Sequence, residues 1–264
     1  MTLIKKANIA QLLVLFLAIT SCAKEIKKVE LTDAQLPKNV LPILKPAAKD
    51  STELTATYIQ EKRAKIDAFY KKNWPNNTMN GSFLVAQNGQ IIYEKYNGLA
   101  NLRDKDTITS ETPLHIASVS KVLTATVILK LVNAKRLDLD QKVTTLLDRF
   151  PYPDVTVRTL LNHRSGIRNY SYFTDRKANI WDRHKTLTNQ DLLDLMATKN
   201  IGLEFRTDSR FAYCNTNYAM LALIIEKVTK LSYIEAMNKM LFQPLGMTHS
   251  FVYDIKKDKR RIVP

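Results

Sequence analysis

Glycine is scarce in this chain, since only six of its 264 residues are Gly, against an average of about 7%. Phosphate-binding loops and dinucleotide fingerprints need several glycines within one short window, and no window here has them. The two cysteines, Cys22 and Cys214, are too few for a disulfide framework. The four histidines and two cysteines show no zinc-ligand spacing. We therefore expect no nucleotide-loop chemistry, no disulfide scaffold, no metal site and no cofactor.

The charged residues are unbalanced in sign. Forty Lys and Arg against 25 Asp and Glu give a formal net charge of +15. The basic residues are mostly scattered, with short clusters at 61–72 and 255–261, and they lack the basic and aromatic pattern of a nucleic-acid groove. We therefore expect lysine-rich solvated surfaces and no nucleic-acid partner.

The apolar run near the N-terminus is too short to cross a bilayer. It covers residues 9–20 with one interruption, whereas a spanning helix needs about 20 residues. Two lysines precede it, at positions 5 and 6, and a basic segment before a short apolar one is typical of a secretory signal. We predict that residues 1–21 are a signal peptide.

The end of this segment, Ile19-Thr20-Ser21-Cys22, resembles a bacterial lipobox. Such signals are cleaved before the cysteine, so the resemblance implies lipidation of Cys22 and a lipid anchor rather than a membrane helix. A generic signal peptide with a chance cysteine is the alternative. Residues 22–50, with three prolines and no periodicity, predict a tether. We expect a lipid-anchored location in the cell envelope, facing either the periplasm or the outside.

The remaining residues, 51–264, predict one domain. Asp50 with Glu53 resembles a capping pair that opens a helix, and this helix should stop before Trp74-Pro75. Asn88-Gly89 between two alternating segments predicts a β-hairpin. Further predicted elements are an extended piece at 113–117, a buried helix at 118–132, and helices near 141–148, 156–162, 188–198, 215–229 and 232–242. The order predicts an α/β fold of the α+β type, with sheet and helices first and an all-α portion after them.

The segment Ser118-Val119-Ser120-Lys121 matches S-x-x-K, the nucleophile motif of penicillin-recognising serine enzymes. Alone the match is weak, because Ser21–Lys24 matches as well. As a structural residue, Ser118 would cap the following helix, but a cap leaves Lys121 unexplained. A cation in the first turn opposes the helix dipole, and in an apolar helix it loses hydration. Both effects favour the neutral amine that base-activated acyl transfer from a neighbouring serine requires.

Tyr213-Cys214-Asn215 is the only Y-x-N segment among the eleven tyrosines. It precedes a second apolar helix, so the structural alternative is a core tyrosine followed by an N-capping asparagine. Each alternative is plausible for one motif, but the two motifs in this order are specific together.

With both motifs, the chain resembles the serine β-lactamase-related group, which includes class C β-lactamases, D-alanyl-D-alanine carboxypeptidases and related esterases. The resemblance runs from about Ser82 to Phe251 and rests on several collinear segments. These segments are His115–Lys121, Leu137–Asp140, Val155–Gly166, Tyr213–Tyr218 and Pro244–Met247. The resemblance implies a β-lactamase/transpeptidase-like fold.

The resemblance also implies a role for each site residue. Ser118 would attack a carbonyl and form an acyl-enzyme, Lys121 and Tyr213 would share the proton transfer, and Asn215 would orient Lys121 and the substrate amide. The backbone N–H of Ser118, at a helix N-terminus, would supply half of the oxyanion hole. Residues 163–166 are expected to be structural, as a helix end with its glycine in the turn.

The chain departs from the family pattern in three places. It has Thr207-Asp208 where relatives usually carry Pro-Gly, and Cys214, expected to be a bystander thiol, where they carry Ser. A third family motif, Lys-Thr-Gly or His-x-Gly on a later strand, is found at none of the six glycines. We therefore expect a domain that is incomplete at its C-terminus, with strands missing beside the N-terminal hairpin and the hairpin edge exposed.

Two functional interpretations follow. The first is an acyl-transferring serine hydrolase of the bacterial envelope, acting on a small-molecule or peptidoglycan-like substrate such as a β-lactam, a D-Ala-D-Ala peptide or an ester. The second is a non-catalytic, truncated penicillin-binding-like envelope lipoprotein. The motif pair favours the first, and the missing third motif favours the second. The sequence leaves both the substrate and the oligomeric state open.

Overall fold

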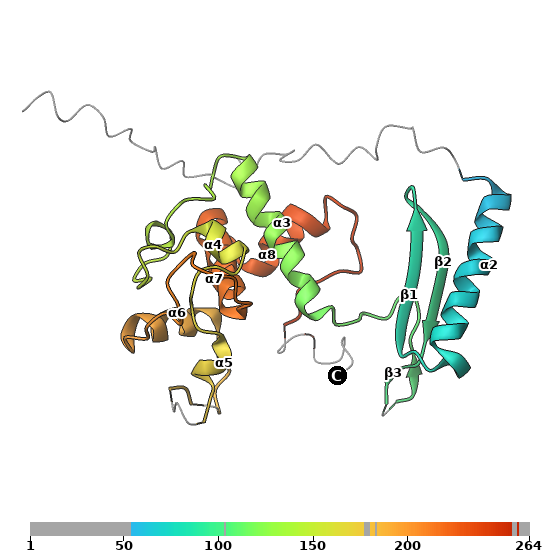
Figure 1. The fold of residues 1–264 in the computed structure, drawn as a ribbon, viewed down its shortest axis with the longest axis horizontal. Helices are drawn as coiled ribbons and strands as arrows, with labels where there is room; N and C mark the ends of the chain where they lie inside the picture. Colours follow the sequence, from blue (N-terminus) through green and yellow to red (C-terminus); the bar gives the residue numbers. More distant parts are fainter. Residues whose placement is uncertain (1–53, 103, 177–179, 183, 255–257, 259–264) are drawn as a thin grey trace, which may run out of the picture. The chain divides into compact units, whose positions relative to one another are not determined.

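The computed structural model describes residues 54–102, 104–176, 180–182, 184–254 and 258. The predicted signal peptide, the tether and Cys22 lie outside the described residues. The described chain begins with a long helix and two strand pairs and continues with helices (Figure 1). This order confirms the predicted α/β fold of the α+β type.

The first described helix, α2 (Ala56–Asn73), begins later than predicted. Its N-cap is Thr55, whose side chain accepts a backbone hydrogen bond from the first turn at 3.2 Å. The predicted capping pair of Asp50 and Glu53 lies outside the described residues. The helix ends before Trp74-Pro75 as expected, because proline disfavours a helical conformation in the residue before it.

The predicted hairpin is present and longer than expected. Strands β1 (Gly81–Gln87) and β2 (Gln90–Asn97) are antiparallel. Asn88 and Gly89 between them have φ values of +52° and +76°, and positive φ at both central residues is the requirement of a type I′ turn. A second small pair follows, formed by β3 (Leu99–Asn101) and β4 (Asp106–Thr107).

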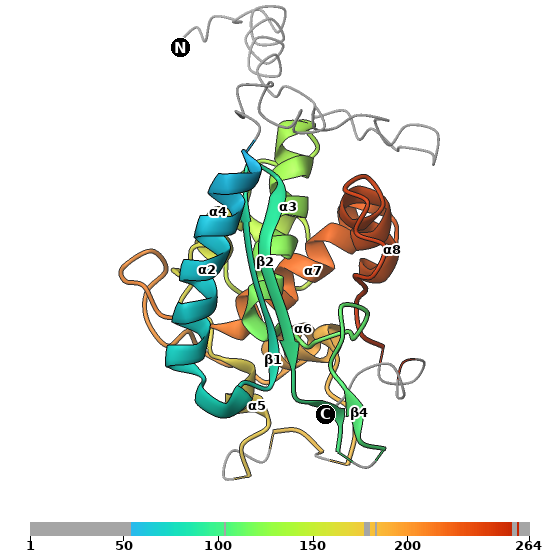
Figure 2. The ribbon, with the colours of Figure 1, turned by 90° about the vertical axis from the view of Figure 1, so that its right-hand side faces the viewer.

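Helix α2 lies along the β1–β2 hairpin in both ribbon views (Figures 1 and 2). Five aromatic side chains hold the two together, with neighbouring ring centroids 5.3–6.5 Å apart. They are Phe69, Tyr70 and Trp74 at the end of the helix and Phe83 and Tyr93 on the strands. Tyr93 also donates from its hydroxyl to Asp67 at 3.0 Å. The helix therefore covers one face of the hairpin.

The other face of the hairpin is exposed and carries two large apolar side chains. Leu84 on β1 and Ile91 on β2 expose 52% and 49% of their surface. Within the described ranges, β1 and β2 pair only with each other. Because a two-stranded hairpin is marginally stable alone, its stability in this chain depends on α2.

The approach to the S-x-x-K motif differs from expectation. Residues 113–116 form no strand, and a short 3-10 turn, η3 (Ala117–Val119), leads into helix α3 (Ser120–Asn133). The helix is buried on one side only, since Val122 and Leu129 expose 64% and 50% of their surface. The prediction of an all-round buried helix is therefore wrong, because the described residues cover only the face that meets the core.

The rest of the described chain is helical. Its elements are η4 (Val143–Thr145), α4 (Val157–Leu161), α5 (Tyr170–Phe173), α6 (Asn189–Thr198), α7 (Asn215–Thr229), α8 (Tyr233–Met237) and the π-helical turn η5 (Asn238–Phe242). Four of the predicted helices are found, with α8 and η5 together filling 233–242. Helix 141–148 is wrong, because the N–H of Val143 bonds to the carbonyl of Val155 at 3.0 Å and Lys142 pairs with Thr156. Helix α5 was not predicted.

Helix α7 is the centre of the core and packs against α3, α4, α6 and α8. Four of its apolar side chains are fully buried: Met220, Leu221, Ile224 and Ile225. The helices around it start at reciprocal capping boxes, which satisfy the first backbone N–H groups. These boxes open α4 at Thr156, α6 at Thr188 and α8 at Ser232. The capping boxes therefore set where α4, α6 and α8 begin, and these helices pack against α7.

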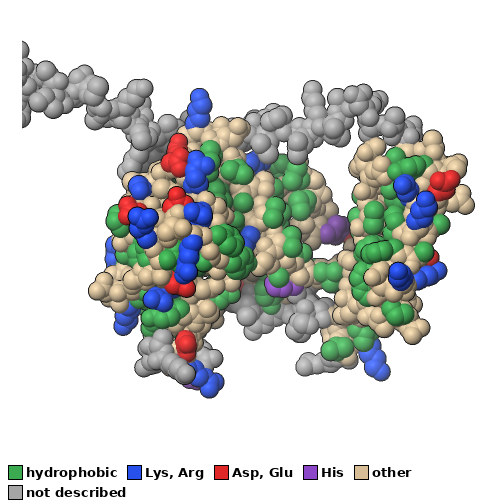
Figure 3. All heavy atoms as spheres, viewed as in Figure 1, with side chains coloured by type: hydrophobic (Ala, Val, Ile, Leu, Met, Phe, Trp, Pro, Cys, Tyr) green, Lys and Arg blue, Asp and Glu red, His purple; other side chains and the backbone are tan. Residues whose placement is uncertain are grey.

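Basic side chains on the face drawn in Figure 3 are spread over α2 and the helical elements. Acidic side chains lie among them rather than on a separate patch. Several pairs are close, including Lys71 with Asp67 at 2.7 Å and Lys227 with Asp148 at 2.8 Å. This face has the mixed, solvated character that the scattered lysines predict.

We expect Gly166→Ala to destabilise the fold strongly. Gly166 has φ +81°, and a Cβ there would lie 2.1 Å from the carbonyl oxygen of Phe205. The strain and the backbone clash should lower the free energy of unfolding by roughly 2–4 kcal/mol, measured by urea denaturation. Gly202→Ala is the matched control, because nothing lies within 4 Å of its Cβ position. Equal stability of the two variants would contradict this account of the turn.

Candidate active site

Ser118 lies in the η3 turn that leads into α3. Ala117 before it has φ +44°, a left-handed conformation that is uncommon for a residue with a Cβ and that clusters at functional sites. The N-cap of this turn is Ile116, so the alternative in which Ser118 only caps the helix is wrong. The N–H of Ser118 belongs to the first turn, where amides have no acceptor within the helix, as an oxyanion donor requires.

The hydroxyl of Ser118 lies between Tyr213 and Lys121. Its Oγ is 2.7 Å from the Tyr213 hydroxyl, and Lys121 Nζ donates to it at 3.3 Å. The second hydroxyl of the motif, on Ser120, donates instead to the carbonyl of Ala117 at 2.7 Å. The structure thus brings together the three residues predicted to act together and distinguishes Ser118 from Ser120.

The ammonium group of Lys121 also lies over two aromatic rings. Its Nζ is 4.9 Å from the ring centre of Tyr213 and 5.7 Å from that of Tyr218, distances at which a cation is attracted to the ring face. Tyr218 lies on α7 and donates to the carbonyl of Leu161 at 3.1 Å. The sequence did not single out Tyr218, and its place one turn after the Y-x-N segment was the only signal. Lys121 itself is half-buried.

The environment of Tyr213 favours its ionised form. Hydrogen bonding with Lys121, followed by that with Ser118, lowers the pKa of Tyr213 from its ordinary value of 10.0. The side chain is 48% exposed, so solvent also reaches the phenol. A lowered pKa raises the fraction of Tyr213 present as phenolate, the form that can accept a hydroxyl proton.

The segment that carries Tyr213 is held against the turn at residues 163–166. Three of its backbone N–H groups donate to carbonyls of the turn: Glu204 to Gly166 at 2.7 Å, Asp208 to Arg164 at 2.8 Å and Ala212 to His163 at 2.9 Å. Gly166 lies in a turn, as predicted. The turn therefore does more than end helix α4, because it aligns the segment that leads to the Y-x-N motif.

Asp208 occupies the position where the resembling family has glycine. Its φ is +64°, a left-handed conformation that Asp tolerates better than most residues with a side chain. Its carboxylate accepts a hydrogen bond from Arg164 Nε at 2.5 Å. At this position Asp208 therefore combines a left-handed backbone with an ion pair to Arg164.

His163 lies behind Tyr213, which the sequence did not predict. Its ring centroid is 4.7 Å from that of Tyr213 and 5.2 Å from that of Tyr218. Its Nδ1 accepts a hydrogen bond from the Cys214 N–H at 3.2 Å. Burial, followed by the charge of Lys121, lowers the pKa of His163. No spacing pattern in the sequence links this histidine to the tyrosine motif.

The two residues after Tyr213 differ in their surroundings. Asn215 begins α7, and its Oδ1 is buried without a hydrogen-bond partner among the described residues. Cys214 is buried, and its thiol donates to the carbonyl of Ile167 at 3.2 Å. Burial raises the pKa of Cys214, as expected for an unreactive bystander thiol.

Neither a metal cluster nor a membrane-spanning helix is found within the described ranges. No three His, Cys, Asp or Glu side chains there are placed to hold a metal ion. In the same part of the chain, no helix combines the length and the apolar character that a membrane crossing needs. The predicted lipidation site, Cys22, lies outside the described residues.

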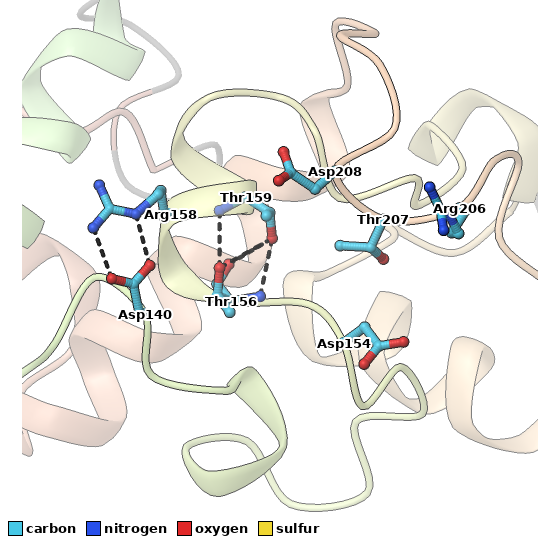
Figure 4. Close-up of a pocket in the computed structure, with 8 residues that line it drawn as sticks. All are labelled: Asp140, Asp154, Thr156, Arg158, Thr159, Arg206, Thr207 and Asp208. Carbon is cyan, nitrogen blue, oxygen red and sulfur yellow. Dashed lines mark hydrogen bonds and ion pairs between the residues drawn. The ribbon is translucent and has the colours of Figure 1, made fainter.

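A polar cavity of about 350 Å³ is separate from the Ser118 group (Figure 4). Its lining is Asp140, Asp154, Thr156, Arg158, Thr159, Arg206, Thr207 and Asp208. Arg158 forms a two-bond ion pair with Asp140 at 2.7 and 2.8 Å, and Thr156 and Thr159 cap α4 reciprocally. Within this lining, Arg158 and Asp140 are therefore paired with each other, as are Thr156 and Thr159.

The family model described as Beta-lactamase matches residues 69–262. The chain belongs to the Beta-lactamase family. It is 33% identical over 205 residues to penicillin-binding protein 4* of Bacillus subtilis (strain 168). This alignment covers 77% of this chain and 44% of that protein. It is 32% identical over 172 residues to a D-aminopeptidase of Brucella anthropi. This alignment covers 63% of this chain and 31% of that protein.

A solved structure supports the same Beta-lactamase assignment. The penicillin binding protein from Bacillus halodurans matches with a TM-score of 0.61 and 26% identity, over 72% of this chain and 56% of that one. The predicted β-lactamase/transpeptidase-like fold is thereby confirmed. The chain spans less than half of the length of the two curated relatives, 44% and 31%. All four predicted site residues that the structure describes lie inside the region matched by the family model.

We expect Lys121→Met to raise the pKa of Tyr213 toward its ordinary value of 10.0, because the largest cause of its lowering is the hydrogen bond with Lys121. The titration is followed by NMR on the chain labelled with [ζ-¹³C]tyrosine, and Tyr213→Phe assigns the signal. Lys199→Met is the control, since this exposed lysine caps the end of α6. An unchanged Tyr213 titration in Lys121→Met would refute the electrostatic coupling.

Proposed function

We propose that this chain carries the nucleophile and the proton-transfer groups of an acyl-transferring serine hydrolase that acts on a peptide, β-lactam or ester carbonyl. The observation that carries the proposal is the position of Ser118 Oγ, 2.7 Å from the Tyr213 hydroxyl and 3.3 Å from Lys121 Nζ. A nucleophile in hydrogen-bond contact with its base is the arrangement that covalent catalysis requires. Membership of the Beta-lactamase family and likeness to a D-aminopeptidase support it.

Acylation moves one proton and exchanges one bond. Ser118 Oγ bonds to the carbonyl carbon while its proton passes to the phenolate oxygen of Tyr213. The charge that develops on the carbonyl oxygen meets the N–H of Ser118 at the start of the helical run. When the tetrahedral intermediate collapses, the bond to the leaving nitrogen or oxygen breaks, and the leaving group takes the proton back from Tyr213. The acyl group remains on Ser118.

Deacylation repeats these steps with water. Tyr213 accepts a proton from a water molecule, whose oxygen attacks the acyl carbon, and the bond to Ser118 Oγ then breaks. The proton returns to Ser118, and the acid is released. Lys121 supports both steps because its positive charge stabilises the phenolate between proton transfers. The mechanism uses protein groups and water alone.

Asn215 fits the role of a substrate contact. Its Oδ1 is buried and has no hydrogen-bond partner among the described residues, and such an oxygen destabilises the fold unless a ligand satisfies it. An amide N–H of the substrate would supply the missing donor. Orientation of the substrate amide is the role that the resemblance implies for Asn215.

The proposed location is the bacterial cell envelope, with the chain anchored by lipid on Cys22. The support is the basic segment, the short apolar run and the lipobox-like Ile19-Thr20-Ser21-Cys22. One acyl chain alone binds membranes reversibly, so stable anchoring would require more than one lipid chain on the modified cysteine.

A second candidate function is a non-catalytic, penicillin-binding-like envelope protein. Its support is the similarity of the chain to proteins named penicillin-binding protein. Covalent labelling separates the two candidates, because binding without acylation leaves Ser118 unmodified.

We expect a fluorophosphonate probe to form a covalent adduct on Ser118, detected by mass spectrometry of the intact chain and of its peptides. Ser118→Ala should abolish the adduct. Ser120→Ala is the matched control within the same motif and should be labelled, because its hydroxyl is bonded to the Ala117 carbonyl rather than to Tyr213. Absence of labelling in both the wild-type chain and the Ser120→Ala variant would favour the non-catalytic function.

We expect Cys22→Ala to abolish lipid attachment. The full sequence is expressed in a bacterium fed an alkyne-bearing fatty acid, and the label on the protein is read after coupling to a fluorophore. Wild-type chain should be labelled and recovered with membranes, whereas Cys22→Ala should be unlabelled. Cys214→Ala is the control, since that thiol is buried in the fold. Equal labelling of Cys22→Ala and the wild type would refute the anchor.

A further inference from the structure

The hydrogen bond to Cys214 determines the protonation state of His163. The backbone N–H of Cys214 is always a donor, and it points at His163 Nδ1 from 3.2 Å. Nδ1 must therefore carry a lone pair, which leaves the imidazole neutral with its proton on Nε2. Only this neutral form fits the observed contact.

A buried polar network fixes the same ring. Asn217 on α7 lies with its Nδ2 3.4 Å from His163 Nδ1, and its Oδ1 accepts a hydrogen bond from Ser165 Oγ at 2.6 Å. The Ser165 hydroxyl accepts in turn from the Ile167 N–H at 3.1 Å. Asn217, Ser165 and His163 are 0%, 1% and 8% exposed. The network joins the turn after α4 to the start of α7.

The flat side of the imidazole supports the catalytic tyrosine. The ring of Tyr213 is tilted by 37° at a centroid distance of 4.7 Å, and that of Phe211 meets the imidazole edge at 5.9 Å. His163 also has φ +58°. A left-handed backbone conformation at a residue with a buried, titratable ring destabilises the fold. Such strained residues are found mainly at functional sites.

We propose that His163 is a positioning residue for Tyr213, which its neutral ring holds against Ser118 by binding the Cys214 N–H and packing on the phenol. The inference rests on the proposed acyl transfer. It assigns to this histidine more than the structural helix end that the sequence predicts.

Protonation of His163 would undo this arrangement. A proton on Nδ1 would face the Cys214 N–H, so two donors would oppose each other at the residue next to Tyr213. The groups around the ring are Lys121 from α3, Tyr213 and the Cys214 thiol from the preceding segment, and Tyr218 and Asn217 from α7. Among these, Lys121 is positively charged, and a second positive charge beside it is unfavourable.

The sign of the pH effect follows from the lowered pKa of His163, whose ordinary value is 6.5. The unfolded chain binds the proton first as pH falls, so the neutral ring contributes full stability above pH 6.5 and loses it progressively below that pH. The position of Tyr213 should change in the same acidic range.

The test compares His163→Asn and His163→Phe in the full chain. Asn places an oxygen acceptor near the position of Nδ1, tolerates left-handed φ and does not titrate. Phe keeps a ring against Tyr213 but removes the acceptor. Urea unfolding first establishes which variants are folded. The readouts are the rate of fluorophosphonate labelling at Ser118 and the pH titration of the [ζ-¹³C]Tyr213 signal.

We expect His163→Phe to slow labelling by about tenfold to a hundredfold, the range for a displaced catalytic group, and His163→Asn to restore most of the rate. In the wild type, the Tyr213 signal should shift below pH 6.5 together with the His163 imidazole signal, and this shift should vanish in His163→Asn.

The proposal is overturned if His163→Phe labels at the wild-type rate, or if the acidic shift of Tyr213 is absent from the wild type or persists in His163→Asn. If His163→Phe does not fold, the titrations of the wild type and His163→Asn decide. A wild-type chain that is never labelled refutes the proposed function, while the Tyr213 titration still tests the positioning role of His163.

Discussion

The hydrogen-bonded contact between the turn at 163–166 and the segment at 204–214 is the constraint on which the site depends. Ser118 and Tyr213 are 95 residues apart in sequence, yet their hydroxyl oxygens lie 2.7 Å from each other. Closing a loop of that length opposes folding through lost chain entropy. Three backbone hydrogen bonds and the bond from the Cys214 N–H to His163 hold the segment in place, and the absent side chain of Gly166 lets the two backbones meet.

Strained conformations gather around this contact. Ala117, His163 and Asp208 all have positive φ, and each such residue costs about 1–2 kcal/mol relative to an ordinary conformation. Burial of the apolar side chains around α7 offsets this strain energy. These side chains also anchor the helix that follows the Y-x-N segment. The stability of the helical core and the geometry of the site are therefore linked through the first turn of α7.

Local features of the fold could be predicted from the sequence. The hairpin follows from Asn88-Gly89, and helices near 188–198 and 215–229 follow from apolar periodicity and end signals. The sequence-based predictions fail where a contact between distant residues overrides the local preference for a helix. The expected helix at 141–148 gives way to η4, because the N–H of Val143 bonds to the carbonyl of Val155 instead of to its helical partner.

The sequence by itself determined that Ser118 and Lys121 share one helical turn, because their spacing of three residues is a property of the helix, and the collinear motifs indicated the family that the comparison confirmed. Only the tertiary structure decided that the Tyr213 phenol meets Ser118, that His163 stands behind it, and that Asn215 Oδ1 is left without a partner among the described residues. These relations depend on how α7 and the turn after α4 pack, and packing between distant segments leaves no periodic pattern in a sequence.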